Sequence, residues 1–408
     1  MANSLSASFP QVWAKEQQRV FSKVNVSKMI ADMGFQGEMG YGNILTRPYR
    51  SAGTVQTYTP GSAITIDDLT DTGENLTVNR KFAYGFSRDD FDQIQDKYDV
   101  AASYGKDYGI YLSNQVDSDV LGEVLNANAS NIVDDGTLAG TSGNGIALTT
   151  SNVGSVFGYA KQELAKQNIA STDYFAVISP EFENILLQYL AGKFTSLGDQ
   201  VSENGYIGSY YGFKIYRSTQ LAMTIVVIET TNPSNNDTLV LSLGGTSQTF
   251  TYVSSIGTTA GNILIGASAT ATGDNLVTLL TTPGTTTSTG VALTGTALRK
   301  VQNGVSAVNS SGTVTITIKG QGVSTAVGTF TSGNNSVSAV KTIQHQMFGV
   351  KGAPTIVMQK EPMSPEVRDV QDKLGKNILG GVLYGVKTFV DNAKMMVDVK
   401  IKASSFSV

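Results

Sequence analysis

Residues 97–126, KYDVAASYGKDYGIYLSNQVDSDVLGEVLN, are the longest stretch of this sequence with a helical period. Apolar side chains recur at every fourth position, preceded by tyrosines at the same spacing: Tyr104, Tyr108, Leu112, Val116, Val120 and Val124. Such a stripe lies on one face of an α-helix, and thirty residues of helix span about 45 Å. We expect a structural spine on which other elements pack.

The region before the spine has no helical period and predicts extended structure. Residues 54–59 and 75–86 are predicted strands, and the second carries three aromatic side chains on one face. Pro60-Gly61 and residues 71–73 are predicted turns. A two-stranded ribbon is marginal in water by itself. The polar excursion over residues 46–86 is therefore expected to be stabilised by lying on a neighbouring subunit.

The region after the spine predicts a mixed α/β domain. A helix over residues 153–166 and a strand over 173–178 precede Ser179-Pro180-Glu181, which has the N-cap, first-turn proline and acid of a helix start. The aromatic segment 206–217 is predicted to be a tight turn between apolar strands rather than a base-stacking surface. Three later segments are strand-like: residues 355–359, 382–389 and 396–401.

The sharpest boundary in the chain is compositional. Between Ala222 and Val340 there are six charged residues, Glu229, Asp237, Asp274, Arg299, Lys300 and Lys319. This Thr/Ser/Gly-rich stretch reads as a module inserted into a different host domain, with low-complexity disorder as the alternative. Regular strand signals favour the compact module.

Local signals inside this stretch predict a small α+β fold with Thr-rich strands. Residues 238–243 and 248–253 flank Gly244-Gly245, a hairpin signal. Asp274 is expected to cap a short helix that Pro283 stops. Two further elements are expected, a strand over residues 314–318 and a helix around 297–302.

Composition leaves little material for catalysis. There is no cysteine and one histidine, His345, which excludes disulfides, thiolate nucleophiles and two-histidine metal sites. His345 is expected to be a hydrogen-bonded structural residue. The net charge of −4 argues against a general nucleic-acid coat. No apolar run approaches the length of a bilayer span, and no secretory signal is apparent, so the protein is expected to be soluble and made in the cytoplasm.

Motifs that suggest chemistry have simpler explanations. Asp71-Thr72-Gly73 matches the tripeptide of aspartic proteases, but those enzymes need two paired carboxylates, and the segment beginning at Asp134 lacks the flanking apolar strand. A hydrolase that uses Asp71 and Asp135 is retained as a third hypothesis. The acids between Asp89 and Asp96 are better explained by a helix start than by calcium. We predict no enzymatic activity, metal or cofactor.

The order of the parts resembles a known family. A basic helical arm, a long β excursion, the strand ending in RKFAYGFSRDDFDQIQ, the spine, and then YFAVISPEFENILL and NGYIGSYYGFKIYRSTQL resemble the major capsid proteins of tailed bacteriophages, with the Hong Kong-type phage capsid fold. The C-terminal SPEVRDVQDKLGKNILGGVLYGVKTFVDNAKMMVDVKI resembles the podovirus coat branch. The resemblance covers the host region outside residues 222–340.

The resemblance implies an α+β phage major capsid fold with the following parts: N-terminal arm 1–45, extended β loop 46–86, peripheral domain 87–150 with spine helix 97–126, axial domain with returning peripheral strands 151–221 and 341–408, and an inserted strand-rich domain 222–340. The insert departs from the coat branch and looks like a Thr/Gly-rich module of phage structural proteins. The chain begins at the arm, which implies a separate scaffolding protein.

The implied function is self-assembly into the icosahedral shell that encloses the double-stranded DNA genome of a tailed phage. The implied partners are further copies in hexamers and pentamers, a scaffolding protein, a portal protein, a decoration protein and packaged DNA without sequence-specific contact, and no membrane. The implied location is the virion, with assembly in the host cytoplasm. The alternative is a tail-tube or surface-layer structural protein, which shares Thr/Gly-rich strands.

Charge along the chain suggests where subunits meet. Residues 1–50 are net basic and residues 51–100 net acidic, a pattern that suits pairing between subunits, although two solvated faces would explain it equally well. The candidate intersubunit contacts are the bases and acids of the excursion, namely Arg47, Arg50, Asp67, Asp68, Asp71, Glu74, Arg80 and Arg88.

Overall fold

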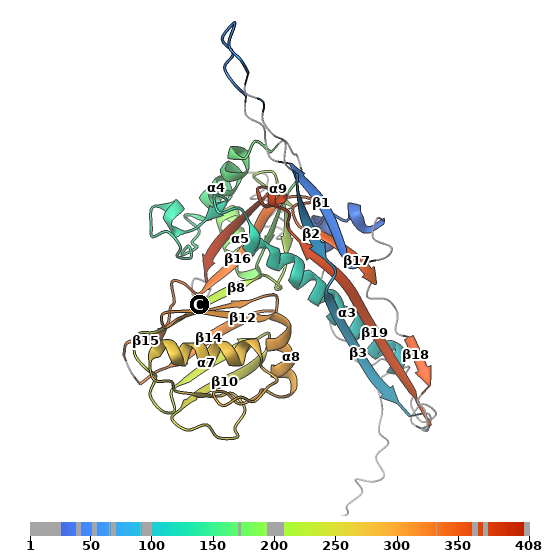
Figure 1. Cartoon of the computed structure of the whole chain (residues 1–408), viewed down its shortest axis with the longest axis vertical. Helices are drawn as coiled ribbons and strands as arrows, with labels where there is room; N and C mark the ends of the chain where they lie inside the picture. Colours follow the sequence, from blue (N-terminus) through green and yellow to red (C-terminus); the bar gives the residue numbers. More distant parts are fainter. Residues whose placement is uncertain are drawn as a thin grey trace, which may run out of the picture.

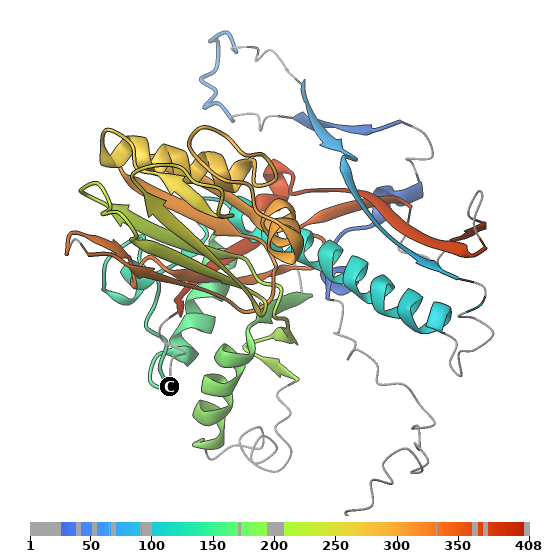
Figure 2. The same ribbon diagram turned by 90° about the horizontal axis from the view of Figure 1, so that it is seen from below.

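The computed structural model describes residues 26–37, 42–50, 55–64, 66, 71–89, 91, 100–169, 173–193, 208–331, 333–360, 366–369 and 374–403. Residues 1–25 of the basic N-terminal segment and residues 67–70 lie outside this set. Figures 1 and 2 show a broad body from which a thin arm projects at one end.

A ten-stranded sheet runs through the body (Figure 1). Its order is β12-β13-β8-β16-β5-β7-β6, with β15 paired to β8, β20 to β16, and β4 to β20. The strands outside the 222–340 segment are β4 Ile132–Val133, β5 Tyr174–Ile178, β6 Ser209–Tyr210, β7 Phe213–Arg217, β16 Ile343–Val350 and β20 Met396–Lys402.

Helices cover both faces of this sheet. Alternate residues of β5 enter different cores, Ala176 on one face and Val177 on the other. The first core lies under α4 (Val153–Lys166) and α5 (Pro180–Ala191). The second lies under the spine, α3, which spans Val100–Gly122. The 3-10 turn η3 (Glu123–Asn126) continues α3, so the predicted spine is confirmed over its described part.

A second sheet packs beside the spine. It consists of β17 (Thr355–Lys360), β19 (Lys376–Lys387) and β18 (Glu366–Asp369), with β3 (Arg80–Arg88) on the other edge of β19. The three predicted aromatic side chains of β3 do share one face, toward α3. The Tyr84 ring stacks on the Tyr108 ring with centroids 4.8 Å apart.

The segment 222–340 builds a third core. Its remaining elements are β8 Met223–Glu229, β9 Thr238–Leu243, β10 Thr246–Val253, β11 Asn262–Leu264, α7 Ala269–Thr281, α8 Gly295–Gly304, β12 Val305–Ser310, β13 Thr313–Ile318, β14 Ser324–Thr329 and β15 Asn335–Val337. β9, β10, β11 and β14 form a four-stranded sheet facing α7 and β13 across the core. β8 and β15 belong to the central sheet, so the segment is continuous with the body.

The last elements are the arm and short connecting turns. β1 (Ile44–Arg50) pairs antiparallel with β2 (Asp71–Thr77). The connecting elements are α1 Ser27–Ile30, η2 Gly34–Gly37, η4 Asp135–Leu138 and α9 Val390–Ala393.

Several local predictions are confirmed with their physical cause. Ser179 caps α5 by accepting a hydrogen bond from Phe182 N at 3.2 Å. Gly244 and Gly245 join β9 to β10 with φ of 50° and 83°, the two positive values that a type I′ hairpin turn requires. The helix α4 has the predicted bounds.

Other boundaries were wrong. The first strand of the excursion is β1, not residues 54–59, and it contains Pro48, which the turn-like Gly73 faces across the ribbon. Residues 71–73 therefore begin strand β2 rather than a turn. Pro48 has no N–H to donate to a strand ladder, and a strand at the edge of a sheet tolerates this. The predicted strand 75–86 is divided into β2 and β3. Helix α7 begins at Ala269 because Ser268, not Asp274, caps it.

Candidate functional site

The arm is a two-stranded ribbon whose register brings the predicted bases and acids together within one chain. Arg47 lies opposite Glu74, and Arg50 lies opposite Asp71. For Arg50 and Asp71 the structure gives the strand position alone. Asp67 and Asp68 lie outside the described residues. Within one chain, these bases and acids face each other across the ribbon, an arrangement that opposite charges on the two strands favour. Pairing between subunits stays a prediction.

The root of the arm is fixed to the loop that follows β19. Arg47 Nη1 donates to Asn392 Oδ1 at 3.4 Å, and its guanidinium lies 4.9 Å from the centroid of the Phe389 ring. The Glu74 carboxylate accepts from Val390 N at 3.3 Å. These two residues therefore have partners in their own chain, and a second, intersubunit role for them is left as a proposal.

A small hydrophobic cluster lies beneath these polar contacts. Leu76, Val78, Val357 and Phe389 are buried together, and the Phe35 ring meets the Phe389 ring edge-on at 6.3 Å. Only the root of the arm has such a core among the described residues. The described residues beyond the root belong to none of the hydrophobic clusters.

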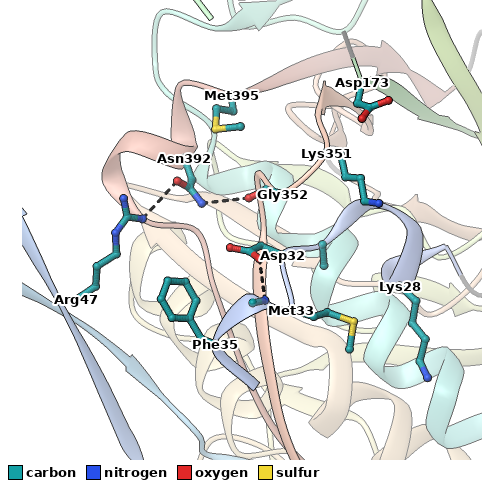
Figure 3. A pocket seen from close by; sticks show the side chains of 12 residues that line it. Lys28, Asp32, Met33, Phe35, Arg47, Asp173, Lys351, Gly352, Asn392 and Met395 are labelled. Atoms are coloured by element: carbon teal, nitrogen blue, oxygen red, sulfur yellow. Dashed lines mark hydrogen bonds between the residues drawn. The ribbon is translucent and has the colours of Figure 1, made fainter. Parts of the chain in front are cut away.

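An open cavity of about 790 Å³ lies beside this root (Figure 3). Arg47 and Asn392 converge on one side of it, and Asn392 Nδ2 donates to Gly352 O at 3.1 Å. Asp32 turns back to accept from Gly34 N at 2.8 Å, and Lys28 points outward. The lining mixes both charge signs, and several of its polar groups bond to each other.

Beyond the root, the excursion exposes apolar side chains to solvent. Val55, Tyr58, Ile64 and Ile66 have 102%, 60%, 65% and 89% of their surface exposed. Figures 1 and 2 show residues 55–64 at the far tip of the arm, away from the body. Exposed apolar groups gathered on one projection mark an interaction site.

The bases at the two ends of β3 have different settings. Arg80 Nε lies 3.8 Å from Asp119 Oδ2, and its side chain remains 42% exposed. Arg88 pairs in register with Lys376 of β19 at the far end. The structure does not bring the eight predicted contact residues into one site, since they are distributed along the arm and β3.

The spine carries buried carboxylates that the sequence analysis missed. Asp117 Oδ1 accepts from Val26 N at 2.9 Å and from Ser27 N at 2.7 Å, which fastens the N-terminal segment to α3. Asp119 accepts from Tyr384 OH of β19 at 2.7 Å. Glu123 accepts from Thr388 N at 3.0 Å, at the root of the arm. We call these three acids the anchor set: Asp117, Asp119 and Glu123. Each one holds a different segment against the spine, namely the N-terminal segment, β19 and the root of the arm.

Burial raises the pKa of two acids of the anchor set, Asp117 and Asp119. It raises the pKa of Asp117 from 3.8 to about 6, although the two backbone N–H donors oppose the change. It also raises the pKa of Asp119, against the attraction of Arg80. The sequence does contain a signal for these acids. Asp117, Asp119 and Glu123 lie next to the apolar stripe of the spine, and a helix face that only meets solvent does not need acids there.

His345 is buried and hydrogen-bonded on both ring nitrogens. Its Nδ1 lies 2.9 Å from the Asp398 carboxylate of β20, and its Nε2 lies 2.9 Å from Thr224 Oγ1 of β8. The expected structural role fits this placement, because the ring joins the first strand of the 222–340 segment to β16 and β20. The acid and hydroxyl partners were invisible in the sequence, since both are remote along the chain.

The residues of the hydrolase hypothesis are not assembled. Asp71 begins β2 of the arm, whereas Asp135 lies in η4, where its Oδ2 accepts from Thr141 N at 2.9 Å. Within the described ranges no three acidic, histidine or cysteine side chains are grouped to hold a metal ion. Among the described helices, none is both long and apolar enough to cross a membrane.

Comparison with known proteins agrees with this architecture. A family model described as "Phage capsid protein" matches residues 73–263. No curated protein matches the chain. A structure from Mycobacterium phage Che8 is 15% identical with a TM-score of 0.55, covering 96% of this chain and 96% of that chain. The capsid of cyanophage P-SCSP1u is 12% identical with a TM-score of 0.53, covering 98% and 94%.

A third structure, the mature capsid of bacteriophage PhiM1, is 10% identical with a TM-score of 0.52, and the match covers 97% of this chain and 92% of that chain. At these identities the likeness concerns the fold. The fold is that of phage major capsid proteins, and the resemblance to tailed-phage capsid proteins is confirmed.

Proposed function

We propose that this chain is a major capsid protein, which self-assembles into the icosahedral shell around the double-stranded DNA genome of a tailed phage. The observation that carries the proposal is the projecting arm, whose tip between β1 and β2 exposes Val55, Tyr58, Ile64 and Ile66. When such an arm lies on another copy of the chain, its apolar side chains are removed from water, which stabilises the contact. The match to the phage capsid family supports the same reading.

The body of the chain suits a building block of a shell. The spine α3 and its continuation η3 carry the anchor set, so the N-terminal segment, β19 and the arm root are fixed to one continuous element. A rigid body with projecting limbs can make many weak, repeated contacts in a closed lattice. We infer hexamers and pentamers of the chain as the units of that lattice.

The domain boundaries predicted from the sequence are proposed as the functional parts. Residues 1–45 serve as the N-terminal arm, 46–86 as the extended loop and 222–340 as an inserted domain. The low charge of the last segment and its own hydrophobic core support its separate origin. The charged candidates of the excursion and β3 are all proposed to act between subunits, namely Arg47, Arg50, Asp67, Asp68, Asp71, Glu74, Arg80 and Arg88.

Other partners follow from the assembly proposed. A scaffolding protein, a portal protein and a decoration protein would act on the growing or finished shell, and packaged DNA would touch its inner face without sequence preference. The virion is the proposed location, with assembly in the host cytoplasm. The net charge of −4 argues against strong electrostatic binding of DNA, so the contact with the packaged genome is proposed to be weak.

Electron microscopy of the full chain, expressed with and without the neighbouring viral genes, tests this function. Closed shells of uniform diameter are the expected product. Tubes or flat lattices would instead identify the tail-tube or surface-layer alternative. A variant with Ile64→Asp and Ile66→Asp should stay folded but fail to form shells. The matched control, Thr249→Asp on an exposed part of β10, should assemble normally.

A further inference from the structure

A cleft of about 940 Å³ separates the spine from the 222–340 segment. One wall consists of β3 and α3, and the other of the β9–β10 turn, α8 and the turn after β13. The walls approach closely at one end, where Gly320 packs against Ser118 of α3 so tightly that a Cβ would lie 2.0 Å from the Ser118 Oγ. The cleft is thus a fixed feature between two packed parts.

The spine-side wall of this cleft is aromatic. Tyr84 stacks on Tyr108, and the Tyr111 ring meets the Tyr108 ring edge-on at 6.1 Å. Tyr111 is 52% exposed although it lines the cleft. Aromatic rings in an open groove offer apolar contact area at low entropic cost. This wall is therefore suited to receive apolar side chains.

The opposite wall is positively charged. Arg299 and Lys300 line the cleft, and among the described residues no acidic side chain does. Lys300 Nζ donates to Leu243 O at 2.8 Å and so is engaged in its own chain. Arg299 is exposed, and within the described part of the molecule it has no acidic partner. The cleft therefore suits a segment with apolar and acidic side chains in succession.

The tip of the arm has this chemistry. Ile64 and Ile66 are largely exposed, and the sequence continues with Asp67-Asp68. Figure 1 shows residues 55–64 at the opposite end of the molecule from α8, so the tip does not reach the cleft of its own chain. An occupant with this sequence has to come from another copy.

We propose that the cleft between α3 and α8 binds the arm tip of a second copy, with Ile64 and Ile66 against the tyrosine wall and the acidic sequence that follows them near Arg299. This inference rests on the proposed function, and it names the surface that the arm grips. It also gives the 222–340 segment a role, since α8 supplies the cation of the site.

Cross-linking tests the proposal directly, because the chain has no cysteine of its own. Ile66→Cys is combined with Asn303→Cys, an exposed position that lines the cleft, and assembled particles are treated with a short bifunctional maleimide. A ladder of linked subunits on a denaturing gel is expected. The control combines Ile66→Cys with Thr249→Cys, outside the cleft, and should give monomers, as should each single variant.

Charge reversal provides a second, independent readout. Arg299→Glu should raise the protein concentration needed for particle formation about fivefold or more, as expected for loss and reversal of an ion pair. Adding Asp67→Lys and Asp68→Lys should restore assembly, and Arg299→Lys alone should change it little. Restoration by the charge swap is a result that a merely structural role of Arg299 would not give.

The outcomes separate this inference from the function on which it rests. Particles that form normally but give no ladder with the cleft pair, or an equal ladder with the Thr249 pair, would overturn the cleft assignment and leave the capsid function intact. A wild-type chain that forms no particles would overturn the function itself. Binding of duplex DNA that Arg299→Glu abolishes, without any ladder, would assign the cleft to nucleic acid and refute the proposal.

Discussion

Asp117 offers a quantitative test of the anchor set, because its role as a hydrogen-bond acceptor and its ionisation respond differently to substitution. It is buried, it accepts hydrogen bonds from Val26 N and Ser27 N, and burial raises its pKa to about 6. In the unfolded chain the group titrates near 3.8. The folded protein therefore binds this proton more tightly, and the resulting stability is present at low pH and lost as pH rises through about 6.

The magnitude follows from the size of the shift. For this group alone, the free energy of unfolding should fall by about 2 kcal/mol between pH 4.5 and pH 7.5. Asp117→Asn keeps an acceptor oxygen but cannot ionise, so its stability relative to wild type should improve by that amount across the same interval. Asp117→Ala instead leaves two buried N–H groups unpaired and should cost about 2–4 kcal/mol.

Urea denaturation followed by circular dichroism at the two pH values measures both effects. Limited proteolysis around residues 26–31 should show faster cleavage in Asp117→Ala alone. Asp173→Asn, an exposed acid paired with Lys214, is the control and should leave stability nearly unchanged, because solvent screens an exposed ion pair. If Asp117→Asn showed the same pH dependence relative to wild type as this control, the account of a buried, ionised anchor would be wrong.

Three further substitutions test other parts of the structure. His345→Leu leaves Asp398 buried without its partner and should lower the free energy of unfolding by about 3–5 kcal/mol, measured in urea. Burial raises the pKa of Glu229 to about 7, so the protein should lose stability as pH rises through that value. Glu229→Gln should therefore reduce the fall in melting temperature between pH 5 and 8. Gly320→Ala should clash with Ser118 and destabilise by more than about 2 kcal/mol, whereas Gly333→Ala, with open space around it, should not.

Local sequence signals predicted the elements whose stability is local. The spine, the cap at Ser179 and the hairpin at Gly244-Gly245 each depend on residues within one or two turns of the chain, and each was found. The arm was predicted as an excursion, but its strands were misplaced. Pro48 argued against a strand there, and an edge ribbon tolerates proline where a central strand does not.

Contacts between distant segments could not be read from the sequence. The partners of His345, Asp398 and Thr224, come from strands on either side of it in the sheet, and only the topology brings them together. Likewise Asp117 resembled a solvated acid until Val26 and Ser27 were placed beside it. The cleft combines α3, β3 and α8, three elements with no shared local signal, so it became visible only in the folded chain.

The central claim is that the arm is completed by another copy of the same chain. Cryo-electron microscopy of particles assembled from the full-length protein tests it most directly. The account predicts a closed icosahedral shell in which residues 55–66 of each subunit lie on a neighbour, with Ile64 and Ile66 covered. A particle in which these residues fold back onto their own subunit, or a chain that stays monomeric at high concentration with its assembly partners present, would contradict it.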